Sequence, residues 1–233
     1  MPHGGPEARD SYAYNLWGQF LATRGYAVFQ PNFRGSSGFG RRFAEAGYGQ
    51  WGGTMQSDVE SGIQHLIDTG RVDPGRMCIF GASYGGYVAL YAGASQPGRY
   101  RCVASFAGVS DLAESVARDC RYFGRDSATC AYWMKSIGDP SSQRARLDAL
   151  SPVKMAAAFR APVLLVHGEY DDNVLADQSR DMERALKRAG NPVKLVILKE
   201  AGHSGWTSVN MRVALSELDA FLAQHMGAQT GPK

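Results

Sequence analysis

The sequence predicts an α/β protein with a mostly parallel sheet and helices on both faces. Two patterns lead to this prediction. Short runs rich in Val, Ile, Leu and Phe, each bounded by Gly or Pro, have the length and composition of buried strands. Segments with helical periodicity separate these runs, and such alternation of strand and helix is typical of a parallel sheet whose connections cross its faces.

Five runs are predicted strands because each is a short stretch of aliphatic and aromatic residues beside a turn residue. They are GYAVFQP, RMCIFG, YRCVASFAG, APVLLVHG and PVKLVILK, at residues 25–31, 76–81, 100–108, 161–168 and 192–199. Five further segments are predicted helices because their apolar residues recur every three or four positions. They cover about residues 11–24, 54–69, 84–95, 174–189 and 206–225.

Residues 109–160 interrupt this alternation with polar, aromatic and cysteine-containing stretches. We expect this segment to form an inserted cap and a connecting helix. No linker rich in Gly, Ser or Pro divides the chain, and 233 residues with 44% hydrophobic side chains suffice for one sizeable core. The prediction is therefore a single domain over residues 1–233.

Composition excludes two classes of partner. The 25 basic and 22 acidic residues are interspersed and leave a net charge of +3, without the clustered basic stripe that nucleic-acid binding requires. No apolar segment approaches the roughly 18 to 20 residues of a membrane span. The start of the chain, MPHGGPEARD, also lacks the layout of a signal peptide. We expect neither a nucleic acid nor a membrane as a partner.

The four cysteines permit either full pairing or none. Cys120 and Cys130 lie in a polar stretch where a local disulfide fits an oxidising compartment. Cys78 and Cys102 lie in apolar runs, and the sequence leaves open whether they are bridged or simply buried as small hydrophobic residues. No CxxC pair suggests a metal site.

The segment Gly81-Ala82-Ser83-Tyr84-Gly85 matches G-x-S-x-G, directly after a predicted strand and directly before a predicted helix. This is the setting of a nucleophile elbow, in which a strained turn exposes the serine hydroxyl at the end of the sheet. A side chain at either glycine would crowd the crossing of strand and helix. The alternative is a Gly/Ser turn without chemistry.

A serine hydroxyl needs a histidine base and a carboxylate, which in this type of sheet follow in the order Ser, Asp, His. Asp171 follows the predicted strand at 161–168, and His203 follows the one at 192–199. Both stand at carboxyl ends of strands, where open α/β sheets place their sites. Spacing alone does not separate Asp171 from Asp172.

The remaining histidines, one arginine and three tryptophans fit structural roles better than roles in catalysis or binding. His65 lies within a predicted helix, His167 closes a strand and His225 is near the C-terminus. We expect Arg34 to pin a glycine-rich loop, and three tryptophans to pack rather than to bind: Trp51, Trp133 and Trp206.

A tetrahedral intermediate needs two N–H donors for its oxyanion, one from the residue after the nucleophile and one from an early glycine loop. Tyr84 supplies the first. The stretch His3-Gly4-Gly5-Pro6 is the candidate for the second, because paired glycines let a backbone approach the substrate closely.

These segments together resemble the catalytic domain of the prolyl oligopeptidase family of serine peptidases, and are similar to its dipeptidyl peptidase and acylaminoacyl peptidase branches. The motifs HGGP, PNFRGSSGFG, WGGTMQSDV, DPGRMCIFGASYGGYVAL, SPV, HGEYDDNV and GHSGW occur in the family's order. The resemblance implies an α/β-hydrolase fold and Asp171, rather than Asp172, as the acid. It also implies that Asn173 holds a backbone carbonyl of the substrate, and that Val174 and Tyr84 lie beside the pocket for the residue preceding the cut.

Two departures from the family pattern stand out. Some branches have an oxyanion-hole tyrosine where this chain has His3, so a backbone N–H, that of Gly5, must serve here. Members of the family also have strands and a β-propeller ahead of HGGP, which are absent from this sequence. We therefore expect an N-terminally truncated piece of a longer protein, of periplasmic or secreted origin, with a bare strand edge.

The prediction is a serine peptidase that cleaves short peptides through Ser83, Asp171 and His203 and an acyl-enzyme, without a metal or organic cofactor. A carboxylesterase that hydrolyses small esters is one alternative, because the same site chemistry serves both reactions. An inert module of a larger peptidase is another. The sequence does not decide whether the chain forms a homo-oligomer.

Overall fold

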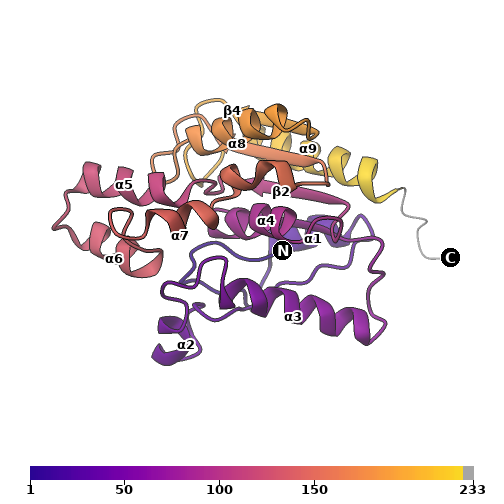
Figure 1. Ribbon diagram of the computed structural model, residues 1–233. Coiled ribbons are helices and arrows are strands. Elements are labelled where there is room, and N and C mark those ends of the chain that lie inside the picture. The colour runs from indigo at the N-terminus through magenta and orange to yellow at the C-terminus, as the bar shows by residue number, and fades with distance from the viewer. Residues whose placement is uncertain (228–233) are drawn as a thin grey trace.

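The fold is built on a parallel sheet of four strands, which the computed structural model describes together with the rest of residues 1–227. The strands lie side by side in chain order, and all three pairings are parallel (Figure 1). Their bounds are β1 Cys78–Ala82, β2 Cys102–Phe106, β3 Val163–Gly168 and β4 Val193–Leu198. Four of the five predicted strands are thus confirmed.

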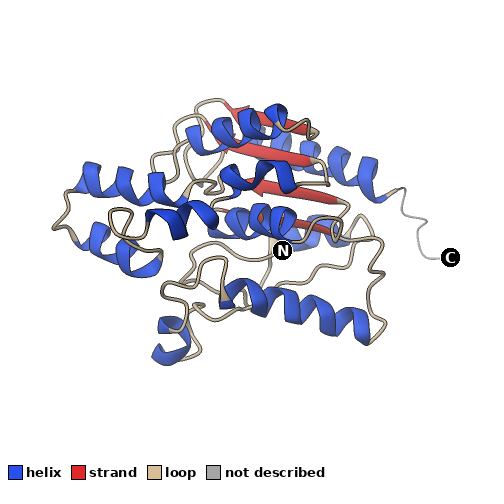
Figure 2. Cartoon of the chain, viewed as in Figure 1, coloured by secondary structure: helices blue, strands red, loops and turns tan. Residues whose placement is uncertain are grey.

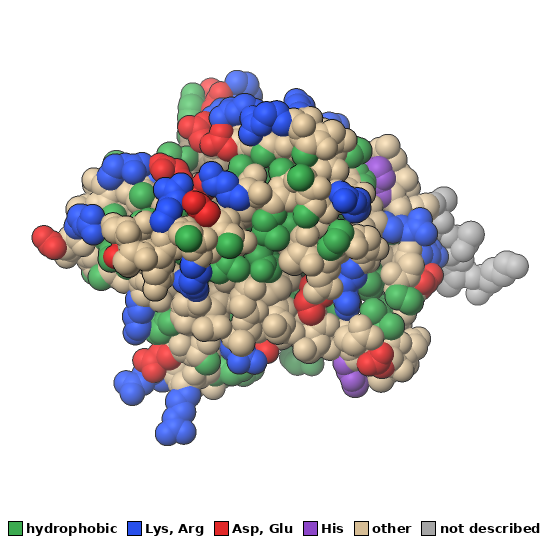
Figure 3. Space-filling view, in the orientation of Figure 1, with side chains coloured by type: hydrophobic (Ala, Val, Ile, Leu, Met, Phe, Trp, Pro, Cys, Tyr) green, Lys and Arg blue, Asp and Glu red, His purple; other side chains and the backbone are tan. Residues whose placement is uncertain are grey.

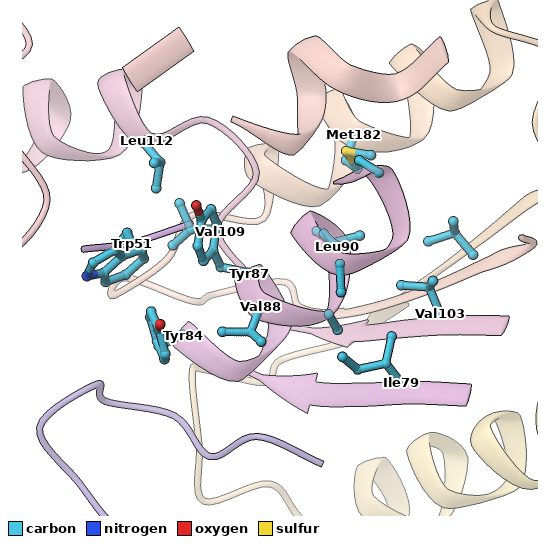
Figure 4. Packing of buried hydrophobic residues seen from close by; sticks show 14 of the residues in the cluster. Trp51, Ile79, Tyr84, Tyr87, Val88, Leu90, Val103, Val109, Leu112 and Met182 are labelled. Atoms are coloured by element: carbon cyan, nitrogen blue, oxygen red, sulfur yellow. The ribbon is translucent and has the colours of Figure 1, made fainter. Parts of the chain in front are cut away.

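Helices cover both faces of this sheet, as predicted (Figure 2). Successive strand residues point to opposite faces, so each strand contributes to two cores. On one face, strand residues such as Phe80 and Leu164 pack against α1 (Leu16–Ala22) and α9 (Ser208–Met226). On the other, Ile79 and Val103 lie beneath α4 (Tyr84–Ser95), as Figure 4 shows.

Two more helices complete the second layer. The helix α8 (Asp177–Arg188) packs on β3 and β4, and contributes Met182 and Leu186 to the same core as α4. The helix α3 (Thr54–Asp68) joins that core through Met55 and Val59. Both were predicted from their periodicity.

The predicted strand at 25–31 is wrong, because this segment makes no β-ladder. An apolar cavity of about 300 Å³ separates it from β1, one of the two edge strands of the sheet. Val28 and Phe29 line one side of the cavity, and Ile79 and Phe80 of β1 line another. A strand cannot form across such a gap, because neighbouring strands must lie about 4.8 Å apart to share hydrogen bonds.

The helix predicted at 11–24 begins only at Leu16, because the side chain of Asn15 accepts a hydrogen bond from Gly18 N–H and caps the helix there. The short helix α2 (Arg41–Glu45) was not predicted. Residues 109–160 form three α-helices and a 3₁₀ helix, and Figure 1 shows α5 and α6 projecting together at one end of the sheet. Their bounds are α5 Leu112–Phe123, α6 Ala128–Ser136, α7 Arg144–Ala149 and η1 Pro152–Ala158.

All four cysteines form disulfides. The bridge between Cys78 and Cys102 joins two residues that are paired in register across β1 and β2. The bridge between Cys120 and Cys130 ties α5 to α6. The local pairing was expected, whereas the sequence left the first bridge open.

The surface carries both signs of charge. On the face shown in Figure 3, Lys and Arg side chains lie among Asp and Glu side chains rather than in one basic stripe. Within residues 1–227, no helix combines the length and the apolar character needed to cross a membrane.

Candidate active site

Ser83 occupies the turn between β1 and α4 in a backbone conformation that L-residues rarely adopt, with φ 56° and ψ −122°. Two glycines make this turn possible. A Cβ at Gly81 would collide with the carbonyl of Gly85, and a Cβ at Gly85 would collide with the carbonyl of Pro2. The first glycine therefore lets the helix cross the strand, and the second lets the N-terminal loop reach the elbow.

The structure brings Ser83, His203 and Asp171 into one hydrogen-bonded chain. His203 Nε2 lies 3.0 Å from Ser83 Oγ, and His203 Nδ1 lies 2.7 Å from Asp171 Oδ2. The three residues follow β1, β4 and β3, so the parallel sheet gathers their side chains at one end. Since a carboxylate only accepts, Nδ1 carries the proton and Nε2 is free to accept one from the serine.

The carboxylate of Asp171 is buried but well satisfied. Asp171 is 3% exposed, and its Oδ1 accepts hydrogen bonds from the backbone N–H groups of Asn173 and Val174, at 3.0 and 2.9 Å. Burial alone would raise its pKa, but hydrogen bonds from His167 and His203 more than offset that effect and hold the pKa well below its usual range. Asp171 therefore remains ionised beside His203, while Asp172 is exposed.

The N-terminal loop lies directly against the elbow. A Cβ at Gly4 would stand 3.3 Å from Ser83 Cβ, so no larger residue fits this approach without a shift. His3 anchors the loop, with Nδ1 2.7 Å from Gly4 O, Nε2 2.8 Å from Ser36 Oγ, and its ring stacked on Phe33. Burial lowers the pKa of His3. Gly5 follows with φ +125°, and a Cβ there would stand 2.8 Å from Glu7 N and 2.9 Å from Ala8 N of the same loop.

The ring of Tyr84 is buried in the core, whereas its backbone begins α4 directly after Ser83. Tyr84 is 1% exposed, and its ring packs in the core against Phe33 and against Trp51, which Figure 4 shows beside it. Burial strongly raises the pKa of the phenol. The N–H of Tyr84 lies in the first turn of α4, where N–H groups have no acceptor within their own helix.

A hollow of about 480 Å³ opens beside Asn173, whose exposed side chain forms part of its wall. The other wall comes from α5 and α6 and mixes aromatic with charged side chains. These residues are Arg118, Asp119, Phe123, Ala128, Thr129, Tyr132 and Trp133. Trp133 packs against the main core cluster, as expected, and also lines this hollow. The sequence signal for this wall was the aromatic, cysteine-containing character of the predicted cap.

The remaining candidates lie elsewhere. Val174 packs against the main core cluster, and His65 is exposed on α3. Arg34 donates to both carboxylate oxygens of Asp58 at 2.7 Å, as expected of a loop-pinning residue. Among residues 1–227, no cluster of three or more His, Cys, Asp or Glu is arranged to hold a metal ion.

A parallel sheet with a serine on a strand-to-helix elbow, followed in the chain by an acid and a histidine, defines an α/β-hydrolase. Structures of known peptidases share this fold over nearly the whole chain. A Mycobacterium tuberculosis puromycin-hydrolyzing peptidase superposes with a TM-score of 0.88 at 30% identity, covering 98% of this chain and 34% of that one.

The chain belongs to the prolyl oligopeptidase family, whose sequence profile matches residues 12–229. It is 34% identical to dipeptidyl aminopeptidase BIII of Pseudoxanthomonas mexicana over 234 residues, covering 100% of this chain and 34% of the relative. It is 29% identical to the acylamino-acid-releasing enzyme of Sus scrofa, covering 88% of this chain and 28% of the relative. The chain thus spans about a third of the length of the curated relatives it matches.

Proposed function

We propose that this chain carries the catalytic apparatus of a serine peptidase that hydrolyses short peptides. The observation that carries the proposal is the continuous hydrogen-bonded chain from Ser83 through His203 to the buried Asp171. Membership of the prolyl oligopeptidase family supports it independently.

In the proposed reaction, Ser83 Oγ attacks the carbonyl carbon of the scissile bond while His203 Nε2 takes the hydroxyl proton. Asp171 holds His203 in the required tautomer and stabilises its charged form. The tetrahedral intermediate collapses as His203 passes the proton to the leaving amine. Water then attacks the acyl-enzyme, with His203 again as the base, and releases Ser83 and the acid product.

The developing oxyanion needs donors that are in place before the reaction. We assign the N–H of Tyr84 to this role, because it lies in the first turn of α4 beside Ser83. We assign the second donor to the glycine loop, as the backbone N–H of Gly5. The close approach of this loop to Ser83 supports the assignment.

The hollow beside Asn173 is the proposed site for the acyl part of the substrate. The Asn173 amide can donate to a peptide carbonyl, and the rings of Phe123, Tyr132 and Trp133 offer an apolar surface for a side chain. Val174 and Tyr84 would support this site from the core beneath it. Two relatives are named as a dipeptidyl aminopeptidase and an acylamino-acid-releasing enzyme, so short peptides are the substrates to test.

The proposal is tested with a fluorophosphonate probe on the wild-type chain and on Ser83→Ala, followed by mass spectrometry of the labelled peptide. We expect labelling at Ser83 and none in the variant, with turnover lowered by about 10⁴-fold or more. The variant should melt at a similar temperature, because Ser83 is small and not fully buried. A folded wild-type chain that stays unlabelled would favour the inert module instead.

A peptide amide and an ester with the same acyl part separate the two enzyme classes. A peptidase should hydrolyse the amide with a rate that Ser83→Ala abolishes. Cleavage of the ester alone would favour the carboxylesterase alternative.

A further inference from the structure

His167 contacts Asp171, the carboxylate of the proposed Ser83–His203–Asp171 relay, although the sequence suggested only a structural role for this histidine. It is the penultimate residue of β3, and its side chain is 0% exposed. Its Nε2 lies 2.7 Å from Val174 O and 3.2 Å from Asp171 Oδ2, and its Nδ1 lies 2.7 Å from Ser179 Oγ. The turn at residues 171–174, which follows β3, thus holds one side of this imidazole, and α8 holds the other.

These contacts determine the tautomer of His167. A backbone carbonyl can only accept, so Nε2 must carry the hydrogen, which it shares between Val174 O and Asp171 Oδ2. Nδ1 faces the hydroxyl of Ser179 on α8, which can donate to it. The ring is therefore held in place, with its Nε2–H between Val174 O and the carboxylate.

The contact can affect the proposed reaction because His167 and His203 face the same oxygen of Asp171. Asp171 Oδ2, to which His167 donates, is also the oxygen that accepts the Nδ1–H of His203. A donor on this oxygen fixes the rotation of the carboxylate and reduces the negative charge that faces His203. By holding Val174 O, His167 also secures the turn whose N–H groups bind the other carboxylate oxygen.

We propose that His167 is a positioning residue. It orients the carboxylate of Asp171 and weakens the electrostatic attraction between this carboxylate and His203. The inference rests on the proposed function of Ser83, Asp171 and His203. Among residues 1–227, Asp171 is the only carboxylate within 4.0 Å of the His167 ring nitrogens, and α8 presents the uncharged Ser179 to the other side.

Three variants test the proposal. His167→Gln keeps an N–H donor, His167→Met removes it at similar volume, and Ser179→Ala removes the hydroxyl that fixes the tautomer. Each is assayed for the rate of fluorophosphonate labelling between pH 4 and 9, for kcat and KM with one peptide substrate, and for its melting temperature.

We expect the plateau labelling rate of His167→Met to fall about tenfold or more, because small errors in the geometry of a catalytic group cost rate steeply. The midpoint of the acidic limb should move about half a unit or more to higher pH, since an unshared carboxylate stabilises the charged form of His203 more strongly. KM should change little, because His167 is buried away from the hollow. His167→Gln should retain most of the plateau labelling rate and leave the midpoint of the acidic limb unchanged. For Ser179→Ala, both quantities should lie between those of the two His167 variants.

Equal losses in the Gln and Met variants, with an unmoved acidic limb, would overturn the proposal and leave His167 as a packing residue. Nitrogen-15 NMR of labelled histidine provides a readout that needs no activity. It should show His167 protonated at Nε2, and His167→Met should displace the Nδ1–H resonance of His203. If the wild-type chain were not labelled at all, the proposed function would fail, yet this resonance would still decide whether His167 acts on the relay.

Discussion

The two disulfides should stabilise the protein to similar extents but affect activity differently. Cys78 and Cys102 are 24 residues apart in sequence, and Cys120 and Cys130 are 10 apart. Closing loops of these lengths in the unfolded chain corresponds to about 3.4 and 2.7 kcal/mol at 25 °C in the chain-entropy treatment. The perturbation is replacement of each pair by alanines.

For the Cys78→Ala, Cys102→Ala variant we expect a loss of about 3 kcal/mol in the free energy of unfolding. In a domain of this size, this corresponds to a melting temperature lower by about 6 to 12 °C. The bridge lies within the sheet, across β1 and β2, so it unfolds with the whole domain. Urea titration and thermal melting, with the native chain as reference, measure both quantities.

The Cys120→Ala, Cys130→Ala variant should show an additional effect on substrate binding. Its bridge ties α5 to α6, and these helices carry Phe123, Tyr132 and Trp133, which line the hollow. A looser cap should raise KM for a peptide severalfold while leaving the rate of labelling by a small fluorophosphonate nearly unchanged. The other disulfide variant is the matched control, since it should lose stability without a change in KM. Losses below about 1 kcal/mol for both pairs would refute the loop-closure reasoning, and an unchanged KM would refute the assignment of the hollow to substrate.

Two further predictions concern acid stability and the cavity beside β1. The pKa of Asp171 is depressed in the folded state, so its contribution to stability is fully present above the unfolded value of about 4 and is lost as the pH falls below it. The stability difference between wild type and Asp171→Asn, from urea titrations, should therefore be constant from pH 6 to 8 and shrink below about pH 4; a constant difference down to pH 3 would contradict this. Separately, a six-residue segment of alternating Val and Thr fused ahead of Met1 should fill the cavity, pair with β1 and raise the melting temperature, whereas a Gly-Ser segment of equal length should not. Equal melting temperatures for the two fusions would show that the edge of β1 does not accept a strand.

The strands and the site were predictable where the determining signal is local. Each of β1 to β4 is a short and largely apolar run, and the two central strands, β2 and β3, are buried along their whole length. The meeting of Ser83, Asp171 and His203 then follows from parallel topology, because the strand ends that precede them lie at the same edge of the sheet.

The features that sequence reasoning missed depend on partners distant in the chain. The run at 25–31 has strand composition, but a strand also needs a neighbour for its hydrogen bonds, and composition does not reveal a cavity there. The pairing of Cys78 with Cys102 depends on the register of β1 against β2. His167 looked structural because only the folded chain brings Ser179, Val174 and Asp171 around its ring.

The cavity and the catalytic elbow are linked through the first residues of the chain. The amino group of Met1 donates to Phe29 O in the wall of the cavity, and burial lowers its pKa to about 5. The residues that follow place Pro2 O against Gly85 and Gly4 against Ser83. Residues 1–4 thus connect the wall of the cavity to the elbow at Ser83. A fused strand that fills the cavity should therefore also hold the glycine loop more firmly at Ser83, and should raise the labelling rate together with the melting temperature.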